Sequence, residues 1–177
     1  TMEWHGDEQQ AAVFDQACAA LRAQGAELTP IDFSPMYALA RLLYEGPWVA
    51  ERHAVLESFM AELADQMDPT VASIVAQAQG QSATAAHRAE YQRMALQRQI
   101  LNVFNEFDAL LVPTAPLLPT QAQVAEAPVT VNSWLGAYTN FVNLADCSAL
   151  ALPAGFRADG LPAGITLIAP AWQESAM

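Results

Sequence analysis

The sequence contains no lysine. Its seven basic residues are all arginines, set against 19 acidic residues, and the net charge is −12. Without an ammonium group, the 177 residues cannot by themselves form a lysine Schiff base, clamp phosphates with a P-loop lysine or use a lysine as general base. Nucleic-acid binding requires clustered cations, which this acidic chain lacks. We therefore expect no nucleic-acid partner.

Long apolar runs, cysteine pairs and metal-ligand spacings are also missing. No run of about 18 uncharged apolar residues is present, so we expect no membrane partner. Cys18 and Cys147 lie among apolar neighbours without a CxxC spacing, which predicts buried free thiols and a cytoplasmic location. His5, His53 and His87 share no ligand spacing, and no glycine-rich phosphate loop occurs. We expect no metal and no cofactor.

The residues that are present predict an α/β fold. A hydrophobic content of 53% over 177 residues is enough for one domain with a buried core. The first two-thirds is rich in helical apolar spacing, and the last third contains short apolar runs typical of buried strands. Helices are predicted over 8–24, 34–45, 48–64, 69–79, 82–107 and 134–144, extended segments over 27–33 and 109–112, a loop over 114–132, and a β-hairpin over 149–153 and 164–168.

The longest predicted helix has one apolar and one charged face. Its buried face is predicted to carry Ala86, Met94, Leu101 and Phe104. The charged residues of the other face are interpreted as a solvated surface rather than a binding stripe; they are Arg88, Glu90, Arg93, Arg98 and Glu106.

A dense group of functional side chains surrounds Gly46-Pro47, where a helix is predicted to break. On an unbroken helix, Tyr44 and Arg52 would lie about 12 Å apart along the axis and point about 80° apart. The break can re-aim both side chains toward one pocket, where an arginine fork and a phenol suit a small anionic amide. The alternative is a kinked core helix on which Arg52 pairs with a neighbouring carboxylate, which would be Glu45, Glu51 or Asp65.

A second dense stretch spans residues 135–146. Asn140, Asn143 and Asp146 recur every three residues among apolar neighbours. Such side chains either fix the backbone of a turn or bind a ligand. The residues alone favour the structural role.

Four motifs together resemble one enzyme family, the amidase signature family, in its allophanate hydrolase branch. They are LYEGPWVAER at 43–52, DALLVPTAP at 108–116, LGAYTNFVN at 135–143 and LPAGFRADGLP at 152–162. The match runs in order from about Trp4 to Pro170. The first and third motifs indicate the allophanate branch, whereas the other two are typical of the whole family.

The resemblance implies part of an α/β/α sandwich with a mixed β-sheet. It also implies hydrolysis of allophanate to ammonia and carbon dioxide in urea degradation by a Ser-cis-Ser-Lys triad. The sequence has no lysine and no adjacent serines, so no catalytic residue is carried over. Residues 1–177 are therefore expected to be the C-terminal portion of a single amidase domain, without its N-terminal catalytic portion. Tyr44 and Arg52 match the family's substrate-binding tyrosine and arginine.

Two alternatives to this function stay open from the sequence. The chain could be a portion of another amidase-signature enzyme acting on a different small amide, or a non-catalytic remnant used as a binding module. Whether the chain alone is an enzyme is left open.

A partial domain exposes a broken sheet edge and apolar surface, so we also expect a homo-oligomer or self-association.

Overall fold

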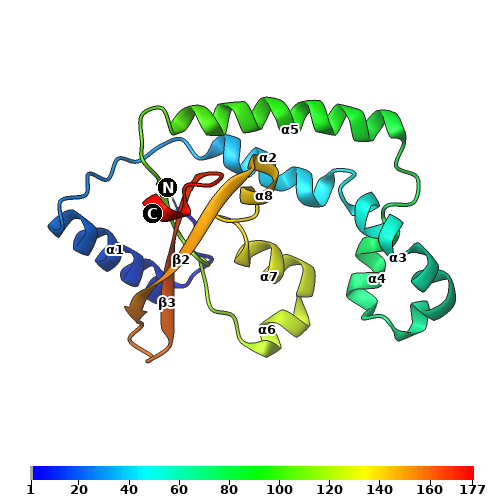
Figure 1. The fold of residues 1–177 in the computed structure, drawn as a ribbon. Coiled ribbons are helices and arrows are strands. Elements are labelled where there is room, and N and C mark those ends of the chain that lie inside the picture. Colours follow the sequence, from blue (N-terminus) through cyan, green and yellow to red (C-terminus); the bar gives the residue numbers. More distant parts are fainter. Residues whose placement is uncertain (1) are drawn as a thin grey trace.

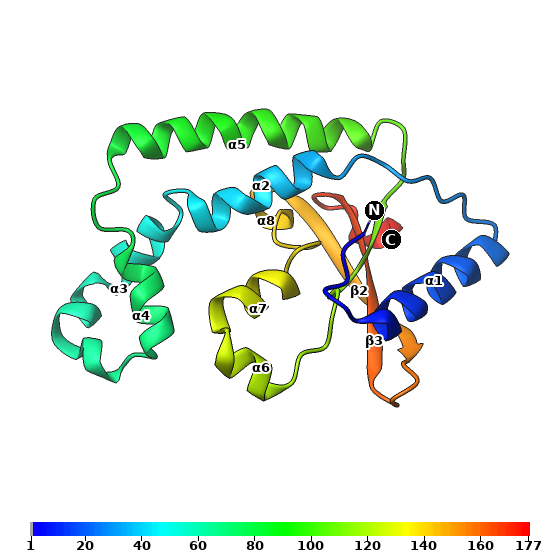
Figure 2. The same ribbon diagram turned by 180° about the vertical axis from the view of Figure 1, so that it is seen from behind.

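The structure is a computed structural model that describes residues 2–177, except for the side chains of Tyr44, Glu45 and Ala64. Figure 1 shows the order of the elements, and Figure 2 shows them from behind. The helices and 3₁₀ turns are α1 (Glu8–Ala23), α2 (Ser34–Glu45), α3 (Val49–Leu63), η1 (Ala64–Gln66), α4 (Pro69–Ala76), α5 (Ala83–Val103), α6 (Gln121–Glu126), α7 (Pro128–Leu135), α8 (Val142–Ala145) and η2 (Glu174–Ala176). The strands are β1 (Leu110–Pro113), β2 (Cys147–Phe156) and β3 (Pro162–Pro170).

The three strands form one sheet in the order β1-β3-β2, so β3 is central. Both pairs are antiparallel, with Leu110 opposite Ile168 in one and Leu150 opposite Leu167 in the other. The predicted C-terminal hairpin is confirmed, and both of its strands are longer than predicted. The resemblance implied a mixed sheet, with both parallel and antiparallel strand pairs. Within residues 2–177, every strand pair is antiparallel.

Helices cover both faces of the sheet because β3 is apolar on both sides. Ile165 packs with Phe14 and Ala17 of α1 on one face. Ile168 is fully buried on the other face, in a core that includes Met36 of α2 and residues of α5 and α8. Alternate side chains of a strand point to opposite faces, which explains this division. The result is the α/β/α layering expected from the sequence.

The prediction of an extended segment over 27–33 is corrected in part. This stretch is extended, but it joins no strand of the sheet. It crosses from the end of α1 to the start of α2, as Figure 1 shows. The sequence predicted an extended segment here but did not reveal whether a partner strand lies beside it.

The buried face of α5 was predicted only in part. Phe104 packs against the core, but Ala86 and Met94 are exposed, whereas Ala89 and Ile100 are buried. The helix lies along α2 and α8, so its buried face is set by where those helices cross it. Arg93 was assigned to the solvated face, but its side chain turns toward α8.

The predicted loop over 114–132 is also wrong in part, because α6 and most of α7 lie within it. Thr120 and Gln123 form a reciprocal capping box at the start of α6, and such a box satisfies two unpaired backbone donors. Pro128 occupies the first turn of α7, where proline is tolerated. Residues 121–132 of the predicted loop are therefore mainly helical, whereas residues 114–120 belong to no helix or strand, as predicted.

The helix predicted over 134–144 is interrupted after Leu135. A turn separates α7 from α8, and Asn140 N–H donates to the Gly136 carbonyl at 2.8 Å. A Cβ atom at Gly136 would lie 2.1 Å from Asn140 Oδ1, so any other residue would force the Asn140 side chain to move. The apolar spacing is helical, but α7 ends at Leu135 and α8 starts only at Val142.

The break at Gly46-Pro47 is confirmed. Helix α2 ends at Glu45, and Gly46 N–H donates to the Leu42 carbonyl at 2.9 Å. A Cβ atom at Gly46 would lie 2.4 Å from the Leu42 oxygen, which excludes any other residue without a backbone shift. Helix α3 starts two residues after Pro47 and packs against α4. Together these two helices form a lobe at one end of the molecule (Figure 1).

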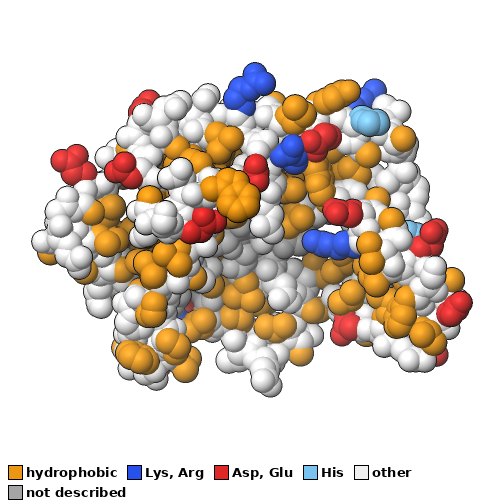
Figure 3. All heavy atoms as spheres, in the orientation of Figure 1, with side chains coloured by type: hydrophobic (Ala, Val, Ile, Leu, Met, Phe, Trp, Pro, Cys, Tyr) orange, Lys and Arg blue, Asp and Glu red, His pale blue; other side chains and the backbone are white. Residues whose placement is uncertain are grey.

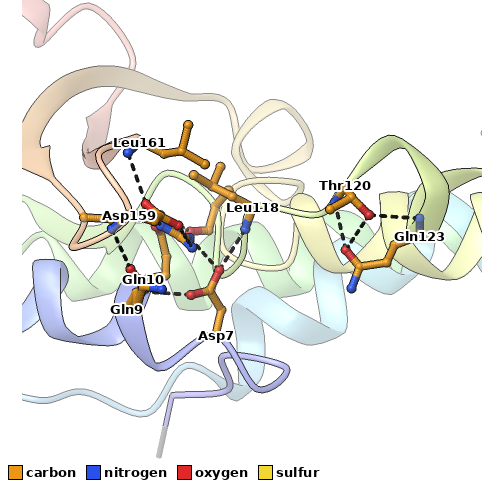
Figure 4. A network of polar contacts seen from close by, with 10 residues as sticks. Asp7, Gln9, Gln10, Leu118, Thr120, Gln123, Asp159 and Leu161 are labelled. Atoms are coloured by element: carbon orange, nitrogen blue, oxygen red, sulfur yellow. Dashed lines mark hydrogen bonds and ion pairs between the residues drawn. The ribbon is translucent and has the colours of Figure 1, made fainter.

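An ionic network joins the start of α1 to the β2–β3 turn (Figure 4). The Arg157 side chain is 7% exposed; it donates to Asp7 Oδ2 at 2.6 Å and to Asp159 Oδ2 at 2.9 Å. Asp7 also accepts from the backbone N–H groups of Gln10, at 3.0 Å, and Leu118, at 3.1 Å. One carboxylate therefore caps α1 and ties it to two other segments.

The same contacts lower the pKa of two carboxyl groups. Burial alone would raise the pKa of Asp7, but the hydrogen bonds from Leu118, Arg157 and Gln10 outweigh it and hold the pKa below 3.8. At the exposed Asp159, the hydrogen bond from Arg157 and then that from Leu161 N–H lower the pKa. Both groups therefore favour the folded state only when they are ionised.

We predict that Asp7→Asn lowers the free energy of unfolding by about 1–3 kcal/mol at pH 7, since a buried charge-assisted bond is lost. The lowered pKa of Asp7 means that its contribution is present above the unfolded value, near 3.8, and is lost as the pH falls through the folded value. Urea unfolding at pH 7 and pH 3 measures both effects. Asp15→Asn, at an exposed position of α1, is the matched control and should change little. An equal effect of both substitutions would contradict the role of Asp7.

Candidate functional site

The two predicted site residues flank the break between α2 and α3. Tyr44 belongs to the last turn of α2 and Arg52 to the first turn of α3. The Tyr44 side chain lies outside the described residues. The Arg52 side chain is exposed, and it forms no ion pair with Glu51 or Asp65. Two of the three surface pairings proposed as the alternative are therefore not formed; the third, with Glu45, also lies outside the described side chains.

The lobe formed by α3 and α4 carries apolar side chains on its surface. Val55 is 80% exposed, and Phe59 and Val71 are also exposed. Figure 3 shows orange apolar side chains over this lobe, and red acidic side chains scattered over the same face of the molecule. Arg52 is thus a cation at the base of an apolar lobe in an acidic protein.

The second predicted stretch, 135–146, is held by α5. Arg93 Nη1 donates to the Leu144 carbonyl at 2.8 Å, and Gln97 Nε2 donates to the Ala145 carbonyl at 3.1 Å. These bonds satisfy carbonyls at the end of α8, which would otherwise lack partners. Glu90 in turn fixes the Arg93 guanidinium through two bonds. Polar side chains of α5 therefore fix the end of α8, an interaction that the sequence did not reveal.

Two of the three polar residues of that stretch, Asn140 and Asp146, occupy turn positions, and Asn143 lies in α8. Asn140 packs over Gly136, and Asp146 ends α8 with a left-handed backbone, at φ 55°. The Asn143 carbonyl accepts from Asp146 N–H at 3.2 Å, and the Asn143 side chain is exposed. Aspartate and asparagine tolerate such conformations better than other residues. This geometry favours the structural interpretation.

Tyr138 anchors the first residues of the chain. It is 2% exposed, and its hydroxyl accepts from Glu3 N–H at 2.6 Å and donates to the Glu3 carbonyl at 3.0 Å. The Tyr37 ring lies 6.0 Å from it. Burial, followed by the hydrogen bond to Tyr138, raises the pKa of Tyr37 well above its ordinary value. The Tyr37 phenol is therefore neutral at physiological pH.

A groove of about 590 Å³ lies beside β1, and sequence reasoning missed it. Its walls are one face of α1, the segment 27–34 and β1 itself, with Met2 and Tyr138 also lining it. We call this space the β1 groove. The signal that could have found it is the unpaired extended segment over 27–33, because an extended segment outside a sheet leaves room for a partner strand. The groove does not include Arg52.

Within the described part of the chain, no group of three histidine, cysteine or acidic side chains is arranged to hold a metal ion. No helix within residues 2–177 has the length and apolar content needed to cross a bilayer.

Both cysteines are free but half-buried rather than buried. Burial raises the pKa of Cys147 to about 11 and also raises that of Cys18, so neither is an activated thiol.

Comparison with known proteins places these features in a family. Urea amidolyase of Saccharomyces cerevisiae is 46% identical over 176 residues, which are 98% of this chain and 10% of that protein. Urea amidolyase of Lachancea kluyveri shows the same identity and coverage. The structure of Kluyveromyces lactis allophanate hydrolase matches with a TM-score of 0.93 and 43% identity over 97% of this chain and 28% of that one.

The chain thus spans between a tenth and about a quarter of the length of these relatives. The family model described as Amidase matches residues 1–177, the full extent of the sequence. The resemblance inferred from the four motifs is confirmed by these matches. This chain belongs to the Amidase family.

Proposed function

We propose that this chain is the substrate-binding portion of an allophanate hydrolase, the amidase that converts allophanate to ammonia and carbon dioxide in urea degradation. The observation that carries the proposal is the match to Kluyveromyces lactis allophanate hydrolase, at 43% identity and a TM-score of 0.93 over 97% of the chain. At this identity the likeness extends beyond the fold, whereas matches at lower identity show the fold alone.

Arg52 is proposed to bind the carboxylate of the substrate, and Tyr44 its amide. Arginine presents a planar fork of donors that fits a carboxylate with two parallel bonds. The exposed Arg52 side chain has no ion-pair partner among the described side chains, so it is free to receive one. The glycine-dependent break at Gly46 sets the direction of α3 relative to α2, and hence the relation between the two positions.

The nucleophile is proposed to come from the rest of the amidase. A Ser-cis-Ser-Lys triad requires a lysine and two serines. The 177 residues contain no lysine and no adjacent serines, so this chain supplies recognition and not the reacting groups. The two free thiols are consistent with a cytoplasmic location, which is part of the proposal.

Self-association of the separate chain is proposed through β2. This strand is a sheet edge, and residues 147–156 carry no charge. Ala149, Ala151 and Pro153 are exposed along it, and Phe156 at its end is 75% exposed. An uncharged edge strand of this kind is a template for pairing with another chain.

We predict that the purified 177-residue chain releases no ammonia from allophanate, since it lacks the triad. A coupled ammonia assay measures this, with an intact allophanate hydrolase as the positive control. Ammonia release above the uncatalysed rate, retained through purification, would overturn the proposed division of roles.

In an intact enzyme carrying this portion, Arg52→Ala is expected to lower kcat/KM for allophanate by at least about 30-fold, because bound substrate would bury the pair between Arg52 and the carboxylate, and truncating one partner of a buried charge pair costs roughly 2–5 kcal/mol. Arg52→Lys keeps the charge but loses the fork, so it should restore activity only in part. Arg41→Ala, at an exposed position of α2, is the matched control. An unchanged kcat/KM in the Arg52→Ala enzyme would remove Arg52 from the site.

Self-association is expected to appear as a mass above 19.1 kDa that rises with concentration. Light scattering coupled to size-exclusion chromatography measures it. Ala151→Lys places a charge on the β2 edge and should return the chain to a monomer, whereas Ala76→Lys on α4 should not. A monodisperse monomer of the unsubstituted chain at all concentrations would contradict the proposal.

A further inference from the structure

We propose that the Asp159-Gly160 pair in the β2–β3 turn is a site of spontaneous conversion of aspartate to isoaspartate, and that the docking of α1 protects this site. The inference concerns a covalent modification of the backbone and does not depend on Tyr44 or Arg52. It rests on the sequence of the turn, on the hydrogen bonds that hold the two reacting groups, and on the contribution of α1 to those bonds.

The reaction joins the side chain of an aspartate to the backbone of the next residue. The backbone nitrogen of that residue loses its proton and attacks the side-chain Cγ, so that a C–N bond forms, a C–O bond breaks and one water leaves. Water then opens the resulting cyclic imide, and opening at the backbone carbonyl gives isoaspartate. The water that was lost is returned, so the modification needs no enzyme and no co-reactant.

The turn contains the dipeptide in which this reaction meets least obstruction, because glycine has no Cβ beside the attacking nitrogen. The sequence has one Asp-Gly pair, Asp159-Gly160, and no Asn-Gly pair. Gly160 has a backbone φ of 80°, which residues other than glycine rarely adopt. Both residues are exposed, so water reaches them. The turn therefore selects the same residue that makes the pair reactive.

Hydrogen bonds hold both reacting groups in the folded chain. Gly160 N–H donates to the Arg157 carbonyl at 2.9 Å, and this bond must break before the nitrogen can lose its proton. The Asp159 carboxylate accepts from the Arg157 guanidinium at 2.9 Å and from Leu161 N–H at 3.1 Å. These bonds fix the carboxylate, whereas ring closure requires Cγ to move within bonding distance of the Gly160 nitrogen.

The charge of Asp159 adds to this protection. A carboxylate is attacked less readily than the protonated acid, because the acid loses a neutral water more easily. The hydrogen bond from Arg157, followed by that from Leu161 N–H, lowers the pKa of Asp159, so the reactive acid form is scarce at neutral pH. Loss of the guanidinium would increase the share of the acid form in mildly acidic solution.

The protecting bonds depend on α1. Arg157 Nη1 donates to Asp7 Oδ2 at 2.6 Å, and Asp159 N–H donates to Gln9 Oε1 at 3.1 Å. Figure 4 shows Asp7, Gln9 and Asp159 gathered where the start of α1 meets the turn. If α1 undocks, the guanidinium loses Asp7 and the turn loses Gln9. Local opening of this kind exposes a site without unfolding the whole chain.

Isoaspartate at this position would oppose renewed docking of α1. It adds one carbon atom to the backbone of a turn in which Arg157 N–H donates to the Leu161 carbonyl at 2.8 Å. It also moves the carboxylate away from the position at which Arg157 binds it. A chain modified while α1 is undocked therefore cannot rebuild the original network.

The test incubates the full 177-residue chain at pH 6 and 37 °C. Methylation by a protein isoaspartate methyltransferase measures the isoaspartate formed, and electron-transfer mass spectrometry of the tryptic peptide that starts at Ala158 locates it. We expect formation at residue 159 to be at least about tenfold slower in the folded chain than in the chain unfolded by urea. Asp159→Glu gives the background, because its imide ring is larger and closes far more slowly.

A variant pair tests the contribution of α1. Asp7→Asn removes an anchor of Arg157 and leaves the reacting pair intact, so the folded variant should form isoaspartate about fivefold faster or more. Asp68→Ala removes the cap of α4, which also lowers stability, and should leave the rate unchanged. Circular dichroism checks that both variants fold. In urea, both should react as fast as the unsubstituted chain, and the comparison of its folded and unfolded forms stands without them.

Three results would overturn the inference. Equal rates in the folded and unfolded unsubstituted chain would show that the bonds of the turn give no protection. Equal acceleration by Asp7→Asn and Asp68→Ala would show that general destabilisation, and not the undocking of α1, exposes the site. Isoaspartate at other residues but not at 159 would remove the site itself. None of these results bears on substrate binding at Arg52.

Discussion

The fold depends on burial of the central strand β3 on both faces. Ile165 packs under α1, Ile168 is fully buried beneath α2, α5 and α8, and both sheet partners bond to the same strand. Burying one large aliphatic side chain contributes roughly 1.5–3 kcal/mol, and β3 does so on both sides. The strands β1 and β2 pair with β3, and α1, α2, α5 and α8 pack over its two faces, whereas α3 and α4 form a lobe of their own.

Local chemistry in the sequence was enough to predict most elements. Asp7, Asp68 and Ser82 cap the helices they precede, and the glycine-proline break separates α2 from α3 as expected. The failures lie where tertiary contacts decide. The buried face of α5 follows the crossing with α2 and α8, so Met94 is exposed although the helical pattern made it a core candidate.

At the candidate site, the roles of Tyr44 and Arg52 stay predictions. The motif around Arg52 identified the correct family, and the break that orients it is a local property of Gly46. The groove beside β1 could not be predicted, because it is bounded by α1, β1 and the segment 27–33, which are far apart in the sequence. The role of Arg93 was missed for the same reason: its partner carbonyl is 51 residues away.

The ion pair between Arg157 and Asp7 joins residues 150 positions apart. Contacts of such separation form slowly, since the loop they close must lose much of its entropy first. During synthesis, α1 leaves the ribosome long before the strands that it covers, and its apolar face stays uncovered until the hairpin has been made. Because the strands that α1 covers follow so much later in the sequence, α1 is expected to be one of the last of these elements to dock.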